Sequence, residues 1–231
     1  MTIRFAAALA GLAAFAYAQP VVAQPVVAKL PGTQGEALRL AEALLPTEQL
    51  LALRLPRFKA SYAEELATDA EVAALEKRYP GVTKAIAAAA REEAAAGYRT
   101  AIGLLRDDAA KLYASRVNAA DTAALVRFFS SNVGRMLVTL SAGSAGDTPT
   151  SFEADRRRKA IEALRNLGPE GQRELMALQT SGLADRMKAL APDVAALSAR
   201  RFGDVDTLIR ARLPASRTRA VAAFPAPSAK R

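Results

Sequence analysis

Apolar residues recur along most of this chain at the three- and four-residue steps of an α-helix. In the longest such segment, 82–117, five apolar positions follow one another by four, three, four and three residues: Tyr98, Ile102, Leu105, Ala109 and Leu112. These steps place the five side chains on one face of a helix, and charged residues occupy the positions between them. The pattern therefore predicts a long amphipathic helix with one buried face.

Capping residues and helix breakers divide the rest of the chain into further helices. Asp69 and Asn118 are each placed to cap a following helix, and Tyr79-Pro80-Gly81, Gly168-Pro169 and Ser181-Gly182 separate neighbouring helices. Pro56 predicts a break between a short helix that begins at 48 and the next one. The other predicted helices are 36–45, 57–66, 69–79, one from 118, one from 131, 153–166, 169–180, 185–201 and 205–212.

The composition agrees with a helical fold, because alanine and leucine are abundant and both are strong helix formers. The sequence predicts an all-α protein, a multi-helix, bundle-like domain of ordinary size. A stretch rich in Gly, Ser and Thr at 142–151 predicts a soft boundary. We expect a helical domain over 35–143, with C-terminal helices over 144–213 that pack on it.

One pair of predicted helices meets at a tight turn that aromatic residues fill. Leu125, Phe128 and Phe129 precede Ser131, which can cap the next helix, and Val133, Leu137 and Leu140 continue the helical spacing. Gly134 stands where a side chain would obstruct a close approach of the two helices. The pattern predicts that Phe128 is largely buried and that this turn is a packing motif.

The first 23 residues have the pattern of a secretory signal peptide. Arg4 precedes an apolar stretch from Phe5 to Phe15, and small residues offer cleavage sites after Ala18 and after Ala23. The sequence thus predicts export to the periplasm, with an extended mature N-terminus over 24–34. No later run of 18 apolar residues follows, so no transmembrane segment is expected after signal removal.

The absence of histidine and cysteine narrows the chemistry that the chain could perform. Disulfides, thiolate nucleophiles, imidazole metal ligands and Ser-His-Asp catalysis are all excluded. Neither a phosphate-binding loop nor a dinucleotide-binding glycine motif occurs. The carboxylate pairs at 92–93 and 107–108 point about 100° apart on a helix, so they do not share a site. We therefore predict no cofactor, no metal and no catalytic residue.

The positive charge of the chain, formally +9, is concentrated near its C-terminus. Residues 207–231 contain no acid and six bases: Arg210, Arg212, Arg217, Arg219, Lys230 and Arg231. Three prolines also lie there, so the sequence predicts a disordered basic tail over 214–231 that does not support the fold. Either the six bases contact an anionic surface such as lipid headgroups, or the tail is only solvated.

A second basic cluster, Arg156-Arg157-Arg158-Lys159, does not predict a nucleic-acid partner. Four consecutive residues of a helix point all round its axis, and Glu153, Asp155 and Glu162 lie within ion-pair spacing of them. A solvated helix face explains the cluster.

The segment from Leu112 to Gly134 resembles the bacterial secreted family catalogued as domain of unknown function 2059. Tyr113, then Asn118 and Asp121 at a capped turn, and then Phe128-Phe129-Ser130-Ser131-Asn132-Val133-Gly134 match its pattern. Thr122, Phe129 and Asn132 depart from it, since the family usually has Leu, Tyr and Pro at these positions. The resemblance implies a small helical periplasmic domain of unassigned activity, and it supplies no catalytic residues.

Two kinds of function stay open at this point. The first is a non-enzymatic envelope interaction protein, whose partner would be an envelope protein or the anionic membrane surface. The alternative is a carboxylate-based enzyme or accessory factor that acts on cell-wall material. Buried carboxylates with raised pKa in one cleft would favour the enzyme, whereas an apolar groove between helices would favour binding of a peptide or helix.

Overall fold

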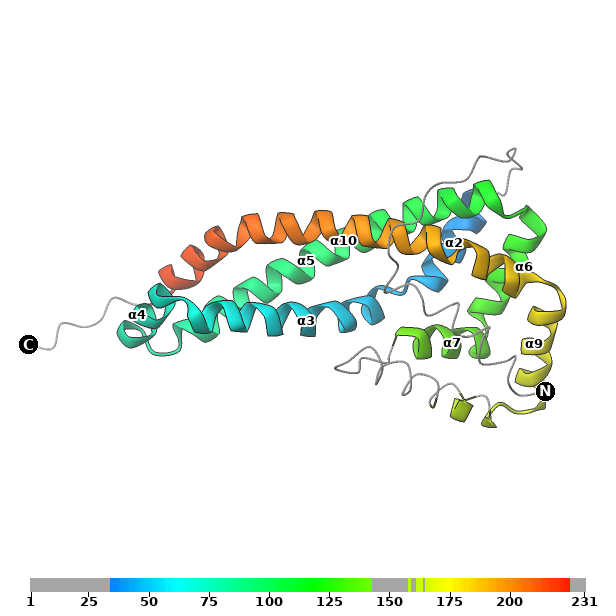
Figure 1. The fold of residues 1–231 in the computed structure, drawn as a ribbon, viewed down its shortest axis with the longest axis horizontal. Helices are drawn as coiled ribbons and strands as arrows, with labels where there is room; N and C mark the ends of the chain where they lie inside the picture. Colours follow the sequence, from blue (N-terminus) through cyan, green and yellow to red (C-terminus); the bar gives the residue numbers. More distant parts are fainter. Residues whose placement is uncertain (1–33, 143–157, 159–160, 164, 225–231) are drawn as a thin grey trace, which may run out of the picture. The chain divides into compact units, whose positions relative to one another are not determined.

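The structure, a computed structural model, describes residues 34–142, 158, 161–163 and 165–224. Within these residues all the regular elements are α-helices, so the all-α prediction is confirmed (Figure 1). The signal peptide, residues 24–33 of the predicted N-terminus, the linker after 142 and residues 225–231 lie outside the described residues. The helices are α2 (Gln34–Leu44), α3 (Thr47–Thr68), α4 (Ala70–Arg78), α5 (Val82–Arg116), α6 (Ala119–Ser130), α7 (Asn132–Ala142), α9 (Pro169–Thr180) and α10 (Leu183–Ala222).

The helix ends that depend on capping side chains and glycines lie where the sequence predicts them. The Asp69 carboxylate accepts hydrogen bonds from the backbone N–H groups of Glu71 and Val72, at 2.8 and 3.1 Å. Asn118 caps α6 in the same way. Gly81 and Gly182 have φ of +93° and +71°, which is backbone that favours glycine. These boundaries follow from local chemistry.

Prolines interrupt the helices less than the sequence predicts. The predicted break at Pro56 is wrong, because α3 continues through it. The predicted helices 185–201 and 205–212 are one helix, α10, which also continues through Pro214 to Ala222. The prediction of disorder from 214 is therefore wrong for 214–222. A proline inside a helix costs about 3 kcal/mol, and side chains buried on both sides of it offset that cost.

The described residues group into two compact units, each built from segments far apart in the sequence. Unit 1 contains the described residues up to Leu50 and those from Ile102 to Arg201, and unit 2 contains Leu51–Ala101 and the described residues from Phe202. The helices α3, α5 and α10 contribute residues to both units. The two units are therefore interleaved along the chain, and the soft boundary predicted at 142–151 stays a prediction.

In unit 1, α2 packs against α6 and α7, and α7 packs against α9. Leu125 and Phe129 of α6 are almost completely buried, with 0% and 1% of their surfaces exposed. Phe128 is only partly buried and lies against Val133, Leu137 and Leu175. Phe128 is less buried than Phe129, because neighbouring helical residues point about 100° apart and Phe129 takes the innermost position.

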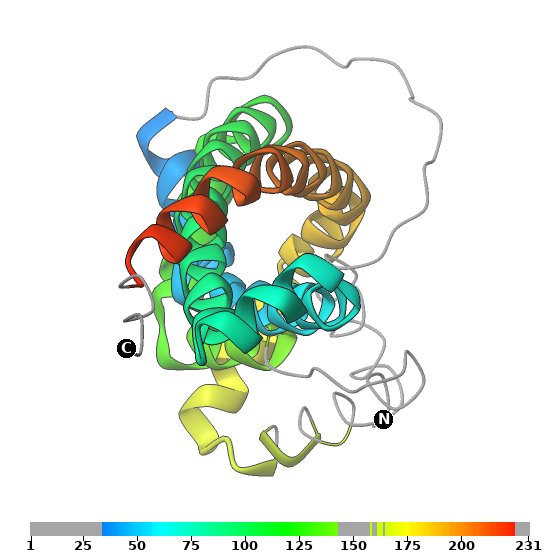
Figure 2. The same cartoon turned by 90° about the vertical axis from the view of Figure 1, so that its left-hand side faces the viewer.

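In unit 2, α10 packs closely on α5. A Cβ added to Gly97 of α5 would lie 2.9 Å from Ile209 Cγ1, so glycine permits this approach. The ring of Tyr98 makes an edge-to-face contact with Phe202, and its hydroxyl donates a hydrogen bond to Asp206 at 2.7 Å. The guanidinium of Arg54 of α3 lies over the Phe202 ring. The second half of α10, coloured orange to red, thereby joins α3, α4 and α5 in one unit (Figures 1 and 2).

Candidate functional site

The family-like motif residues lie in unit 1, where they organise helix ends and packing. Asn118 Nδ2 donates to an Asp121 carboxylate oxygen at 2.7 Å, and Asp121 also pairs with Arg186 of α10. Ser131 Oγ accepts the Gly134 N–H at 3.2 Å and donates to Glu174 of α9 at 2.8 Å. The Asp121–Arg186 pair ties the start of α6 to α10, and the Ser131–Glu174 bond ties the turn between α6 and α7 to α9. They support the prediction of a packing motif.

Gly134 and Tyr113 complete this motif in different ways. A Cβ on Gly134 would lie 2.1 Å from the Phe128 carbonyl oxygen and 2.5 Å from Phe129 Cα, so only glycine fits. Tyr113 is fully buried, and its hydroxyl has no hydrogen-bond partner among the described residues. Burial raises the pKa of Tyr113, which keeps the phenol neutral at any physiological pH.

Four of the six bases in residues 207–231 lie on α10 in unit 2, and each of them pairs with a carboxylate. Arg210 contacts Glu65 of α3 at 3.1 Å, and Arg212 contacts Glu93 of α5 at 3.1 Å. Arg219 also reaches Glu93, at 3.7 Å. Lys230 and Arg231 lie outside the described residues. The positive charge of these four arginines is thus balanced by acids that precede them by more than 100 residues.

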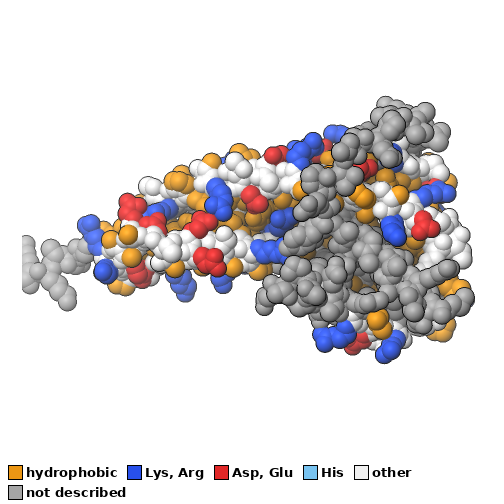
Figure 3. Space-filling model, in the orientation of Figure 1, with side chains coloured by type: hydrophobic (Ala, Val, Ile, Leu, Met, Phe, Trp, Pro, Cys, Tyr) orange, Lys and Arg blue, Asp and Glu red, His pale blue; other side chains and the backbone are white. Residues whose placement is uncertain are grey.

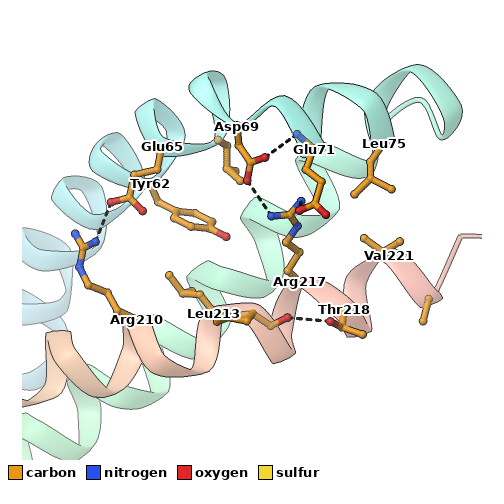
Figure 4. A pocket seen from close by; sticks show the side chains of 13 residues that line it. Tyr62, Glu65, Asp69, Glu71, Leu75, Arg210, Leu213, Arg217, Thr218 and Val221 are labelled. Atoms are coloured by element: carbon orange, nitrogen blue, oxygen red, sulfur yellow. Dashed lines mark hydrogen bonds and ion pairs between the residues drawn. The ribbon is translucent and has the colours of Figure 1, made fainter.

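Arg217 is the most buried of these arginines, with 22% of its side chain exposed. Its two terminal nitrogens contact Asp69 and Glu71, both at 2.9 Å (Figure 4). Asp69 uses its other carboxylate oxygen to cap α4. One side chain therefore fixes α10 to the start of α4.

An open groove of about 730 Å³ lies beside this contact, between α3, α4 and α10 (Figure 4). Leu75 of α4 and Val221 of α10 point toward one another across it. Its apolar lining residues are Leu66, Leu75, Leu213, Pro214, Val221 and Ala222, and its polar ones are Tyr62, Glu65, Asp69, Glu71, Arg210, Arg217 and Thr218. The groove can receive apolar side chains and place charged groups of either sign at their edges.

Two ionisable groups of the groove, Asp69 and Tyr62, have pKa values shifted away from neutral pH. The N–H of Val72, then that of Glu71, and then Arg217 lower the pKa of Asp69. Burial raises the pKa of Tyr62, although Arg217 opposes this shift. Asp69 is therefore ionised and Tyr62 is neutral at pH 7. Neither group is poised to exchange a proton at that pH.

Charges of both signs are interleaved over the coloured residues in view, rather than gathered into one patch of a single sign (Figure 3). Such a surface is typical of solvated, ion-paired helices and differs from the basic stripe that a nucleic-acid site needs. Of the described helices, none has the length and apolar character that crossing a membrane requires.

The chain matches no protein-family model, no curated protein and no solved structure. The resemblance of residues 112–134 to the secreted family of unknown function stays a prediction. The site must therefore be interpreted from its own geometry.

The groove was not predicted from the sequence, because residues 214–231 were interpreted as a disordered tail. A signal was nevertheless present. Arg210 and Arg217 are seven residues apart, as are Arg212 and Arg219. Seven residues are nearly two helical turns, so these pairs form two rows. On a helix the rows flank the face that carries Ile209, Leu213, Ser216 and Ala220, which is the face that the structure buries.

Proposed function

We propose that this chain is an exported, non-enzymatic interaction protein of the cell envelope, and that the groove of unit 2 binds its partner. The observation that carries the proposal is a groove whose apolar lining residues lie beside charged side chains of both signs. Apolar side chains of a partner would lose their water against the apolar lining, which provides affinity. Glu65, Glu71 and Arg210 at the edges would set the orientation of the partner.

The groove favours a protein partner over the anionic membrane surface. Attraction to lipid headgroups needs unpaired basic side chains near the bilayer. Arg210, Arg212, Arg217 and Arg219 each face a carboxylate, so the charge of this helix is largely neutralised while it packs in unit 2. A peptide or helix that presents apolar residues suits the groove better.

The alternative function, a carboxylate-based enzyme or accessory factor acting on cell-wall material, has less support. A general acid at neutral pH needs a carboxyl group whose pKa is raised. In the groove the pKa of Asp69 is lowered, and Glu65 and Glu71 are engaged by arginines. The carboxylates here therefore serve as ion-pair partners.

Export rests on the N-terminal pattern alone, and we propose the periplasm as the location. Arg4, the apolar stretch that ends at Phe15 and the small residues before Gln19 and Gln24 support it. The resemblance of residues 112–134 to a secreted family agrees with this proposal.

Photo-crosslinking in the native host tests the groove and the export together. A photoreactive amino acid replaces Thr218, which lines the groove, or Thr207 as the matched control. Both threonines are exposed on α10 and donate their hydroxyls to the carbonyl four residues earlier, but Thr207 does not line the groove. We expect a discrete adduct at 218 and none at 207, in the periplasmic fraction, on a chain that begins at Gln19 or Gln24.

The possible failures of this experiment are distinct. Equal adducts at 218 and 207, or none at either position, would refute the groove as a binding site. A cytosolic chain that retains Met1 would refute export and leave the groove untouched.

A further inference from the structure

The buried face of α10 carries smaller side chains toward its C-terminal end. Val205, Ile209 and Leu213 are followed on this face by Ser216 and Ala220, and all five are buried. Hydrophobic stabilisation grows with the apolar area that is removed from water. The last two turns of α10 therefore gain less from burial than the turns before Leu213.

Pro214 lies at the point where this change occurs. Because proline has no N–H, it cannot donate the helical hydrogen bond to the carbonyl of Arg210. Its ring also crowds that carbonyl. The backbone of α10 is thus weakened between Leu213 and its last two turns.

Charged contacts and one ring contact hold the segment beyond Pro214. Arg217 bridges Asp69 and Glu71, Arg219 reaches Glu93, and Phe224 lies against Tyr79 with ring centroids 6.3 Å apart. Arg219 and Glu71 are mostly exposed, with 73% and 81% of their side chains accessible. An exposed ion pair shifts the equilibrium between the packed and the detached segment by at most about fivefold, and salt weakens the pair.

We infer that residues 214–224 form a salt-sensitive flap that hinges at Pro214 and carries one wall of the groove. When the flap opens, it takes Arg217, Thr218 and Val221 away from the groove, and the wall formed by Leu66 and Leu75 becomes exposed. One consequence is weaker partner binding as ionic strength rises, and this consequence rests on the proposed function. The opening of the flap does not depend on any partner.

Amide hydrogen exchange on the full mature chain tests the flap without a partner. We compare residues 214–222 with residues 202–213 at about 20 mM and about 0.5 M NaCl, between which the Debye length falls from about 20 Å to about 4 Å. Exchange of 214–222 should rise about tenfold at high salt, while exchange of 202–213 should stay unchanged.

Two matched variants assign the effect to the bridging arginine. Arg217→Gln should give fast exchange of 214–222 at low salt and should remove most of the salt response. Arg200→Gln, which removes an exposed arginine of α10 that pairs with Asp108 at 3.4 Å, should leave the salt response intact.

Two results would overturn the flap. One is exchange of 214–222 that neither salt nor Arg217→Gln changes. The other is an equal rise in 202–213, which would mean that this half of α10 opens as a whole. A salt response without an adduct at 218 would reject only the binding function, and an adduct without a salt response would reject only the flap.

Discussion

Replacing Phe129 with alanine is expected to lower the free energy of unfolding by about 3–5 kcal/mol. The Phe129 ring has 1% of its surface exposed and contacts Phe128 edge-on, with ring centroids 5.1 Å apart. Its removal leaves a cavity between helices that pack around α6, and the backbone cannot collapse to fill it. Chemical denaturation, monitored by circular dichroism, measures the loss.

Phe128→Ala is the matched control, since it deletes the same ring from the neighbouring position. Phe128 is only partly buried, so we expect roughly half the loss or less. If Phe128→Ala were the more damaging change, Phe128 would be the innermost residue, and the described packing of α6 would be wrong.

Gly134→Ala should destabilise the protein by about 3 kcal/mol, at the upper end of what overpacking costs. The added methyl group would meet the Phe128 carbonyl oxygen at 2.1 Å and Phe129 Cα at 2.5 Å. Both are backbone atoms, so no side chain can move aside. The α6–α7 turn would have to open, with the loss of the contact between Ser131 and Glu174.

Gly103→Ala provides the opposite result within the same unit. Gly103 lies inside α5, and an added Cβ would meet nothing within 4 Å. Alanine is the better helix former, so this variant should gain about 0.5–1 kcal/mol. Equal effects of the two substitutions on the denaturation midpoint would show that Gly134 does not mark a close approach.

Much of the helical framework could be predicted because its determinants are local. Asp69 and Asn118 act within three residues of their positions, and Gly134 acts on residues five and six positions away. Side-chain spacing likewise identified the buried face of α5 at Tyr98, Ile102 and Leu105. Such features need no knowledge of distant partners.

The groove could not be predicted because its charges are balanced over long sequence distances. Arg217 lies 148 positions after Asp69, and Arg210 pairs with Glu65 of the distant helix α3. Residues 207–231 contain arginines but no acid, and a proline lies at 214. These features predict disorder from 214, whereas in the structure α10 continues to Ala222.

The last two turns of α10 fold in unit 2 and form a wall of the groove. This is tested by the thermal midpoint, at low salt, of a chain that ends at Leu213 compared with one that ends at Phe224. A domain of this size loses about 2–4 °C per kcal/mol, and we expect the shorter chain to melt several degrees lower. Equal midpoints would show that residues 214–224 do not support the fold and would restore the unstructured tail that the sequence predicts.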